Sequence, residues 1–219
     1  MIMKAVIFDK DGVLIETFDS YLQAYMKILS KIGIKIVEND IAKRYGMKGP
    51  EIIKQIVQEK GKNITDEQTQ ELAREKDRLY KKFSEKNMRL LPGVNRLLVY
   101  LKKKNYKIGI ASSSTKELIE HMMKVTKIEN YIDAIVDGFE VKFSKSDPEI
   151  FLKCAEKLEV EPENCIVIED SIHGINAAKR AGMKTVAVTT GQHTRKELEK
   201  TQPDWILNTL EEFNKIEVL

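Results

Sequence analysis

Short hydrophobic runs alternate along the chain with longer segments in which hydrophobic residues recur at helical spacing. The short runs predict strands at Met3–Phe8, Lys107–Ala111, Ala134–Val136, Cys165–Ile168, Thr185–Val188 and Trp205–Leu207. The helical patterns between the later strands cover Gly93–Lys104, Thr115–Lys124, Pro148–Leu158 and Gly174–Ala181. Strands that alternate with helices in this way are typical of a parallel sheet covered by helices. The pattern therefore predicts an α/β fold.

One stretch breaks the alternation. Between Glu16 and Arg89 no segment has a strand pattern, and hydrophobic residues recur at helical spacing throughout. The charged run Thr65–Lys86 predicts a long exposed helix with an apolar stripe through Leu72, Leu79 and Phe83. We therefore expect an all-helical insert of about seventy residues between the first strand and the rest of the sheet.

The composition places the chain among ordinary globular proteins. It has 219 residues, 42% of them hydrophobic, and a net charge of +3 with both signs interspersed. No basic stripe with interleaved aromatic residues is present, so we expect no nucleic-acid partner. No apolar run reaches the roughly 18 residues of a membrane span, and no signal peptide precedes the first strand. A cytoplasmic monomer is the default expectation.

Two acidic pairs stand at the ends of predicted strands. Asp9 and Asp11 follow the first strand, where positions two apart face the same way. Glu169 and Asp170 follow the fourth strand. Ligands of open parallel sheets lie beyond the carboxyl ends of the strands. Such carboxylates repel one another unless a divalent cation or a retained proton intervenes, and magnesium is the cation that prefers carboxylates plus substrate phosphate.

Hydroxyl groups and a lysine complete the candidate site. Ser112 and Ser113 follow the second strand and offer hydroxyl and N–H donors to an anion, although a serine-rich helix cap would explain them too. Lys145 precedes the helix that begins near Pro148, where it could hold a phosphate against the acidic groups. Together these residues suggest an aspartyl-phosphate enzyme. Asp9 would attack phosphorus, and Asp11 would protonate the leaving alcohol and then activate water.

The motifs resemble those of the haloacid dehalogenase superfamily, in its phosphatase and beta-phosphoglucomutase branch. The motifs that carry the resemblance are Phe8–Val13, the serine motif at Ser112, Lys145 with Asp147–Phe151, and Glu169–Ser171 with the glycines and alanines that follow. The resemblance implies a Rossmann-like core from residues 1–15 and 90–219 and a helical cap from residues 16–89. It also implies Mg²⁺ held by Asp9, the main-chain carbonyl of Asp11 and Asp170, with Glu169 either as a further ligand or behind the ligands, and with Ser112, Ser113 and Lys145 on the phosphate.

Several residues depart from the family pattern. Lys10 stands where the branch more often has an apolar residue, and we expect it at the rim of the site. Glu16 replaces the usual aspartate. The mutase pattern has a histidine at the position of Tyr21 and an arginine near Gly49, and both are missing here. The sequence therefore favours hydrolysis over a mutase reaction.

The leading hypothesis is a magnesium-dependent phosphatase for a small phosphorylated metabolite, such as a sugar phosphate or phosphoglycolate. A beta-phosphoglucomutase-like phosphomutase is the alternative. A signalling receiver domain also pairs aspartates, a hydroxyl and a lysine, but it is shorter and has no helical insert. The insert residues Lys43, Arg44, Met47 and Lys48 suggest a polar, anionic substrate.

Overall fold

A parallel six-stranded sheet forms the centre of the larger part of the molecule. The computed structural model describes residues 3–216, and its strand order is β3-β2-β1-β4-β5-β6. The strands are β1 (Ala5–Phe8), β2 (Lys107–Ala111), β3 (Ala134–Val136), β4 (Cys165–Glu169), β5 (Lys184–Val188) and β6 (Trp205–Leu207). The six predicted strands are all present. β1 begins two residues later than expected, while β4 and β5 are each one residue longer.

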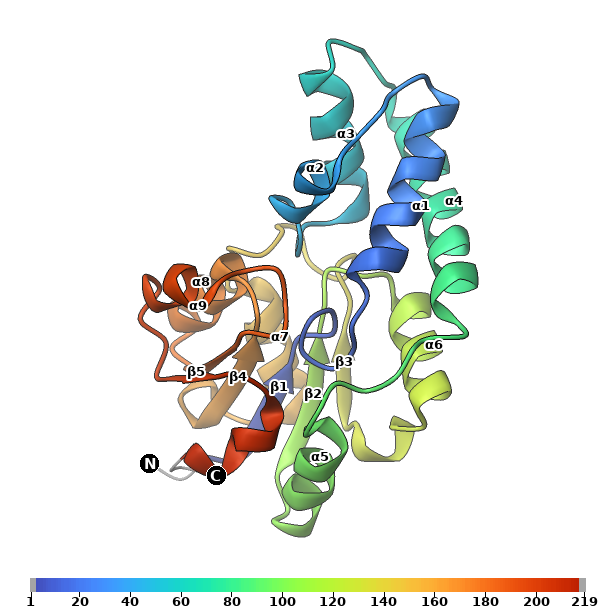
Figure 1. Ribbon diagram of the computed structural model, residues 1–219. Helices are drawn as coiled ribbons and strands as arrows, with labels where there is room; N and C mark the ends of the chain where they lie inside the picture. The colour runs from blue at the N-terminus through green and yellow to red at the C-terminus, as the bar shows by residue number, and fades with distance from the viewer. Residues whose placement is uncertain (1–2, 217–219) are drawn as a thin grey trace.

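Helices cover both faces of this sheet (Figure 1). They are α5 (Val94–Lys103), α6 (Lys116–Thr126), α7 (Glu149–Leu158), α8 (Ile172–Arg180) and α9 (Arg195–Glu199), with short 3₁₀ turns at Glu129–Tyr131, Pro162–Asn164 and Leu210–Lys215. Neighbouring residues of β1 face opposite sides. Val6 and Phe8 pack with α5 and α6, whereas Ile7 packs with α7 and α8. The sheet is therefore buried on both sides, as its uninterrupted apolar strands require.

A group of helices rises above the sheet. It contains α1 (Phe18–Lys31), α2 (Glu38–Ala42), α3 (Gly49–Glu59) and α4 (Asp66–Ser84), and its hydrophobic core is separate from the cores on the two sheet faces. Figure 1 shows α1 and α4 side by side along the length of this group. Two linkers join it to the sheet and lie side by side. Ile15 forms an isolated antiparallel β-bridge with Leu90, and the N–H of Leu91 donates to Leu14 O at 2.9 Å.

Helix α4 differs from its prediction. Its inward face consists of Leu72, Ala73, Lys76 and Tyr80, while Leu79 and Phe83 are only partly buried. The long charged run is thus not a simple exposed helix, because a lysine and a tyrosine within it turn toward the sheet. Thr65 caps the helix and accepts a hydrogen bond from Gln68 N–H at 3.2 Å.

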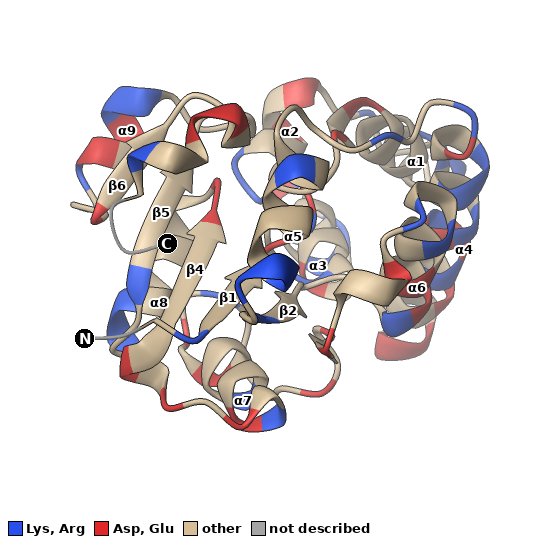
Figure 2. Ribbon diagram, turned by 90° about the horizontal axis from the view of Figure 1, so that it is seen from below, with Lys and Arg blue, Asp and Glu red and all other residues tan. Residues whose placement is uncertain are grey.

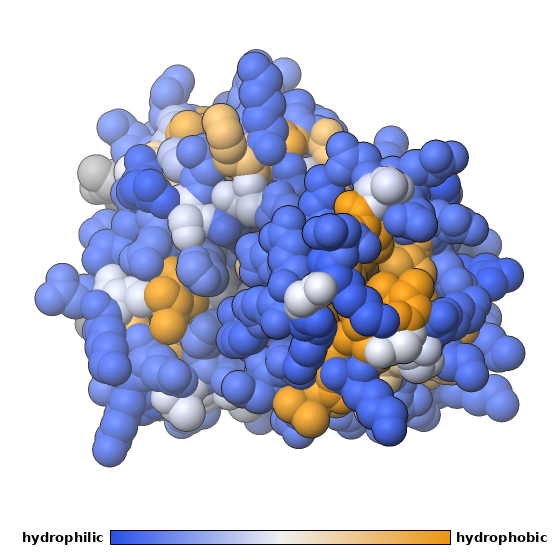
Figure 3. Space-filling model, turned by 90° about the horizontal axis from the view of Figure 1, so that it is seen from above, coloured by the Kyte–Doolittle hydropathy of each residue, from blue (hydrophilic) through white to orange (hydrophobic). Residues whose placement is uncertain are grey.

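Charged side chains cover the outside of the fold. Figure 2 shows Lys, Arg, Asp and Glu on the helices, while the strands are uncharged over most of their length. The face in Figure 3 is largely hydrophilic, with hydrophobic atoms in separate areas. Within residues 3–216, no helix is long and apolar enough to cross a membrane.

Candidate active site

The two predicted acidic strand ends are neighbours in the sheet. β1 pairs with β4 so that Phe8 lies opposite Ile168, and Asp9 N–H donates to Ile168 O at 3.0 Å. Asp9 therefore leaves β1 beside the point where Glu169 ends β4. Both side chains are buried, as is Asp170. Parallel pairing of two short apolar strands is what brings these acidic residues together.

The carboxylates form a compact cluster. One oxygen from each of Asp9, Glu169 and Asp170 lies within 4.8 Å of the others. Lys145 Nζ donates to Asp9 Oδ1 and, at 2.6 Å, to Glu169 Oε1. Four of the residues that the sequence singled out are therefore gathered at one place. Three carboxylates and one ammonium leave an excess of two negative charges when all are ionised.

The pKa values reflect this crowding. Burial raises the pKa of Asp9 to about 7, even though the Lys145 ammonium works in the opposite direction. Burial, followed by the nearby Glu169 and Asp9 charges, raises the pKa of Asp170 well above its ordinary value. Burial alone would lower the pKa of Lys145, but Asp9 and Glu169 outweigh it, so its pKa is raised. The lysine stays charged, but its single positive charge is not enough to compensate the three carboxylates around it.

A divalent cation fits this donor set. Asp170 Oδ2 is buried without a hydrogen-bond partner. Its carboxyl lies in a niche between Gly12 and Gly191, where an added Cβ would come within 2.3 Å and 1.6 Å of Oδ2. Magnesium binds oxygen ligands, and the excess negative charge favours it. Asp9 and Asp170 could hold such an ion together with Glu169, and the predicted ligand set of Asp9, Asp11, Glu169 and Asp170 stays a prediction.

Glu169 has both of its oxygens engaged. Oε2 accepts from the main-chain N–H groups of Asp170 and Ser171, each at 3.1 Å, and from Ser171 Oγ at 2.9 Å, at the start of α8. A Cβ on Gly174 would come within 2.0 Å of this carboxyl group, so the helix approaches closely only because residue 174 is glycine. With Oε1 bonded to Lys145, Glu169 orients that lysine.

Asp11 lies apart from the three-carboxylate cluster. Its Oδ1 accepts from Lys10 Nζ at 2.5 Å and its Oδ2 accepts from Ser114 Oγ at 3.2 Å. Lys10 is fully buried, with its ammonium 5.3 Å from the centre of the Tyr80 ring. The expectation that Lys10 occupies the rim is therefore wrong. Burial alone would lower its pKa, but Asp11 and then Tyr80 outweigh burial and the pKa of Lys10 is raised.

The hydroxyl groups of Ser112 and Ser113 have different hydrogen-bond partners. Ser112 is buried, and its Oγ accepts from Ser114 N–H at 3.2 Å. Ser113 Oγ donates to Gly46 O at 2.6 Å, so that hydroxyl bonds the helical insert rather than the carboxylate cluster. The phosphate role of Ser112 and Ser113 remains a prediction.

A small cavity of about 20 Å³ lies between the helices and the sheet, lined by Tyr21, Gly49, Pro50, Ala73, Lys76, Asp77, Ser113, Ser114, Thr115 and Phe139. Lys76 is buried, pairs with Asp77, and lies 4.7 Å from the Tyr21 ring centre. Sequence reasoning missed Lys76, because a lysine in a charged helix gives no local sign that it faces inward.

The cations proposed from the sequence as substrate contacts have other partners. Arg44 is buried and bonds Glu59, Gln55 Oε1 at 3.1 Å and Asp40 O at 2.7 Å, all within the insert. Lys43 pairs with Glu59 at 3.2 Å. Lys48 Nζ donates to Val141 O at 2.8 Å and Lys142 O at 3.3 Å. Lys43 and Arg44 are thus engaged within the insert, and Lys48 bonds the insert to the core.

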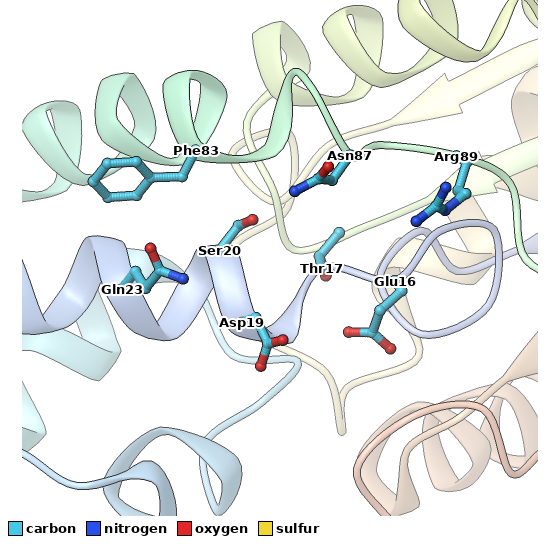
Figure 4. A pocket seen from close by; sticks show the side chains of 8 residues that line it. All are labelled: Glu16, Thr17, Asp19, Ser20, Gln23, Phe83, Asn87 and Arg89. Atoms are coloured by element: carbon cyan, nitrogen blue, oxygen red, sulfur yellow. The ribbon is translucent and has the colours of Figure 1, made fainter.

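A larger cavity of about 500 Å³ lies beside the two linkers. Figure 4 shows Glu16 and Thr17 on one linker, Asn87 and Arg89 on the other, and Asp19, Ser20 and Gln23 along α1 with Phe83 on α4. None of these residues belongs to the carboxylate cluster. The carboxylate cluster, and not the larger cavity, is therefore the candidate active site.

Comparison with known proteins agrees with the motifs and the fold. Residues 6–188 match the family model of haloacid dehalogenase-like hydrolases. The chain belongs to this family. It is 38% identical over 194 residues to a beta-phosphoglucomutase of Bacillus subtilis, covering 87% of this chain and 85% of that protein. It is 33% identical to a phosphorylated carbohydrates phosphatase of Thermotoga maritima, covering 96% of this chain and 99% of the other.

Solved structures give the same result. The crystal structure of a beta-phosphoglucomutase from Clostridium difficile superposes with a TM-score of 0.88 at 30% identity, covering 99% of this chain and 96% of that one. The expected family, the α/β fold and the enzyme class, a phosphoric monoester hydrolase of the haloacid dehalogenase type, are confirmed. A member of this family is not a receiver domain, so that alternative is set aside.

Proposed function

We propose that this protein is a magnesium-dependent phosphatase that hydrolyses a small phosphorylated sugar through a phosphorylated Asp9. One observation carries the proposal: Asp9, Lys145, Glu169 and Asp170 form a buried cluster at the carboxyl ends of β1 and β4. The names of the relatives support the substrate class, because one is a phosphatase of phosphorylated carbohydrates.

The proposed reaction has two steps. In the first, an Asp9 carboxylate oxygen attacks phosphorus and the bond to the leaving oxygen breaks, while Asp11 gives that oxygen a proton. In the second, Asp11 takes a proton from water, which attacks phosphorus and releases Asp9 and phosphate. Lys145 and Ser112 would bind the phosphoryl oxygens. Magnesium bound by Asp9 and Asp170 would supply positive charge to the transferring group.

The helical insert is proposed as a cap of residues 16–89, on a core of residues 1–15 and 90–219, that opens for substrate. The small cavity between insert and sheet beside Ser113 and Ser114 has a volume of about 20 Å³, whereas ligand pockets usually hold about 300–1,000 Å³. Closure after binding would then exclude bulk water from the first step.

Charge pairing on the cap favours hydrolysis over a mutase reaction. A mutase that handles a bisphosphate needs a cation for the second phosphate. Among the described residues of the insert, Lys43 and Arg44 pair with Glu59, and Lys48 is engaged by a main-chain carbonyl of the core. Lys76, a buried cation of the insert, pairs with Asp77 and is thereby neutralised. Hydroxyl groups of a sugar suit this pair better than a second phosphate does.

A phosphate-release assay over a panel of phosphorylated sugars and acids tests the proposal, with magnesium and with chelator. We expect magnesium-dependent release from one or a few small phosphate esters. Absence of release from every ester would contradict hydrolysis.

The 38% identity to a beta-phosphoglucomutase makes a phosphomutase the second candidate. The same assay therefore includes glucose 1-phosphate with a bisphosphate primer. Conversion to the 6-phosphate isomer with little free phosphate would favour the mutase.

A further inference from the structure

Lys10 is a buried cation that the proposed reaction does not use. It follows Asp9 in sequence, and its side chain is fully buried whereas that of Asp11 is 17% exposed. Burying an ammonium is unfavourable unless it is paired, so its contacts determine where it lies. Its hydrogen-bond partner is Asp11 Oδ1, at 2.5 Å.

The two oxygens of Asp11 are held by different donors. Lys10 occupies Oδ1, and Ser114 Oγ lies 3.2 Å from Oδ2. The carboxylate assists both bonds, but Lys10 adds a full positive charge and is closer than the Ser114 hydroxyl, so Lys10 dominates the orientation. Oδ2 is left as the oxygen that can carry a transferable proton.

Tyr80 of α4 fixes the lysine from the cap side. Its ring is fully buried, and its centre lies 5.3 Å from Lys10 Nζ. A cation over an aromatic face that is shielded from water is attracted by the negative charge of that face. The contact chain thus runs from the cap through Tyr80 and Lys10 to Asp11.

We propose that Lys10 is a positioning residue that holds the Asp11 carboxyl so that Oδ2 faces the leaving oxygen, with Tyr80 keeping Lys10 in place. The inference rests on the proposed phosphatase function. In the step concerned, the bond from phosphorus to the leaving oxygen breaks, its electron pair goes to that oxygen, and Asp11 Oδ2 donates the proton.

Two substrates separate positioning from a general structural role. A sugar phosphate has a poor leaving group that needs the proton, whereas p-nitrophenyl phosphate has a leaving group that departs without it. The ratio kcat/KM reports events up to transfer of the phosphoryl group to Asp9. For Lys10→Met we expect kcat/KM to fall about 100-fold on the sugar phosphate, but less than about fivefold on p-nitrophenyl phosphate.

Companion variants sharpen this comparison. Lys10→Arg keeps the charge and should restore much of the lost activity. Tyr80→Leu should show a weaker form of the same selective loss, and Tyr80→Phe, which keeps the ring but loses the hydroxyl that bonds Lys10, should lie between Tyr80→Leu and the wild type. Lys4→Met is the matched control, because Lys4 is an exposed lysine just before β1. Thermal unfolding verifies that each variant folds.

A second measurement follows phosphorylated Asp9 by intact mass. Because Asp11 also activates the attacking water, phosphorylated enzyme should accumulate in Lys10→Met during turnover of p-nitrophenyl phosphate. Equal losses on both substrates, no loss, or no accumulation would overturn the positioning role. If the wild type itself releases no phosphate, the proposed function fails instead.

Discussion

At the scale of single residues, the site is defined by charges that burial leaves uncompensated. Asp9 and Asp170 both have raised pKa values because they are buried near other carboxylates, and Lys145 balances only part of their charge. A bound divalent cation would offset the unfavourable free energy of burying these carboxylates. Two predictions follow from this imbalance.

The first concerns pH in the absence of metal. The pKa of Asp9 rises from 3.8 to about 7 in the folded protein. The folded state therefore retains a proton that the unfolded chain releases between these values, and stability falls as the pH rises through that range. We expect the unfolding temperature in chelator to decrease from pH 5 to pH 8. Magnesium should reduce this decrease, and a profile that is identical with and without magnesium would argue against the site.

The second concerns Asp170→Asn. The substitution removes a like charge, so in chelator at pH 8 we expect the variant to unfold a few degrees above the wild type. It should also lose the stabilisation that magnesium gives the wild type. Calorimetric scans with and without magnesium measure both effects. Glu163→Ala, which changes an exposed carboxylate far from the site, serves as control.

At the scale of elements, the cap is tied to the loop that carries Lys145. Lys48 Nζ donates to Val141 O at 2.8 Å, and Ser144 Oγ donates to Glu51 Oε2 at 2.6 Å. Both bonds span the cleft, from the start of α3 to the segment before α7. They stabilise the closed arrangement in which Lys145 meets Asp9.

Weakening these bonds should favour the open cap. A single such hydrogen bond contributes about 1 kcal/mol. We therefore expect Lys48→Met and Glu51→Ala each to lower kcat/KM about fivefold, without loss of thermal stability. Lys54→Met is the control, because Lys54 lies on the same helix and pairs with Asp66 inside the cap. Steady-state kinetics on the best sugar phosphate measure kcat/KM. An unchanged kcat/KM in both variants would show that these two bonds do not control cap closure.

The edge of the sheet depends on Asp204. Its carboxylate accepts from Lys184 Nζ at 2.6 Å and from Thr185 N–H at 2.9 Å, joining β5 to the turn before β6. Partial burial alone would raise the pKa of Asp204, but these bonds outweigh it and the pKa is lowered. The stabilisation is thus present above the ordinary pKa of 3.8 and disappears as pH falls below it.

Asp204→Ala should accordingly cost about 1–2 kcal/mol at neutral pH. The difference from the wild type should shrink below about pH 4. Urea unfolding at several pH values measures it. A difference that does not change with pH would mean that the carboxylate charge has no part in it.

The elements that could be predicted are those whose sequence pattern is local. The six strands are apolar runs, and Asp9, Glu169 and Asp170 follow strands that pair at the centre of the sheet. Their meeting could be inferred from the rule that parallel strands end at one edge. Helix α9, with five residues, has too short a pattern to stand out.

The residues that could not be predicted depend on packing between distant segments. Lys10 was recognised as a departure but placed at the rim, since nothing in its neighbours reveals that Tyr80 of α4 covers it. Lys76 was missed for the same reason. Arg44 and Lys48 looked like substrate contacts because exposed lysines and arginines near a cleft have the same sequence pattern as those that bond within the fold.

At the scale of the whole molecule, a sheet with two covered faces carries Asp9, the proposed nucleophile, and the helical insert stands above this sheet (Figure 1). The cores of the two parts are separate, and two adjacent linkers join them at Ile15 and Leu90. The proposed chemistry lies at the junction of the two parts. Charged residues on the sheet edge meet charged and aromatic residues from the cap, and a site of this kind is complete only when the cap is closed.

The central claim is that Asp9 receives the phosphoryl group. The most direct test is acid quenching of the enzyme during turnover with magnesium, followed by digestion and mass spectrometry of the peptide that contains residue 9. We expect phosphate on Asp9 in the wild type, and neither phosphate nor turnover in Asp9→Asn, which should remain folded. Turnover by Asp9→Asn, or phosphate on a different residue, would contradict the account.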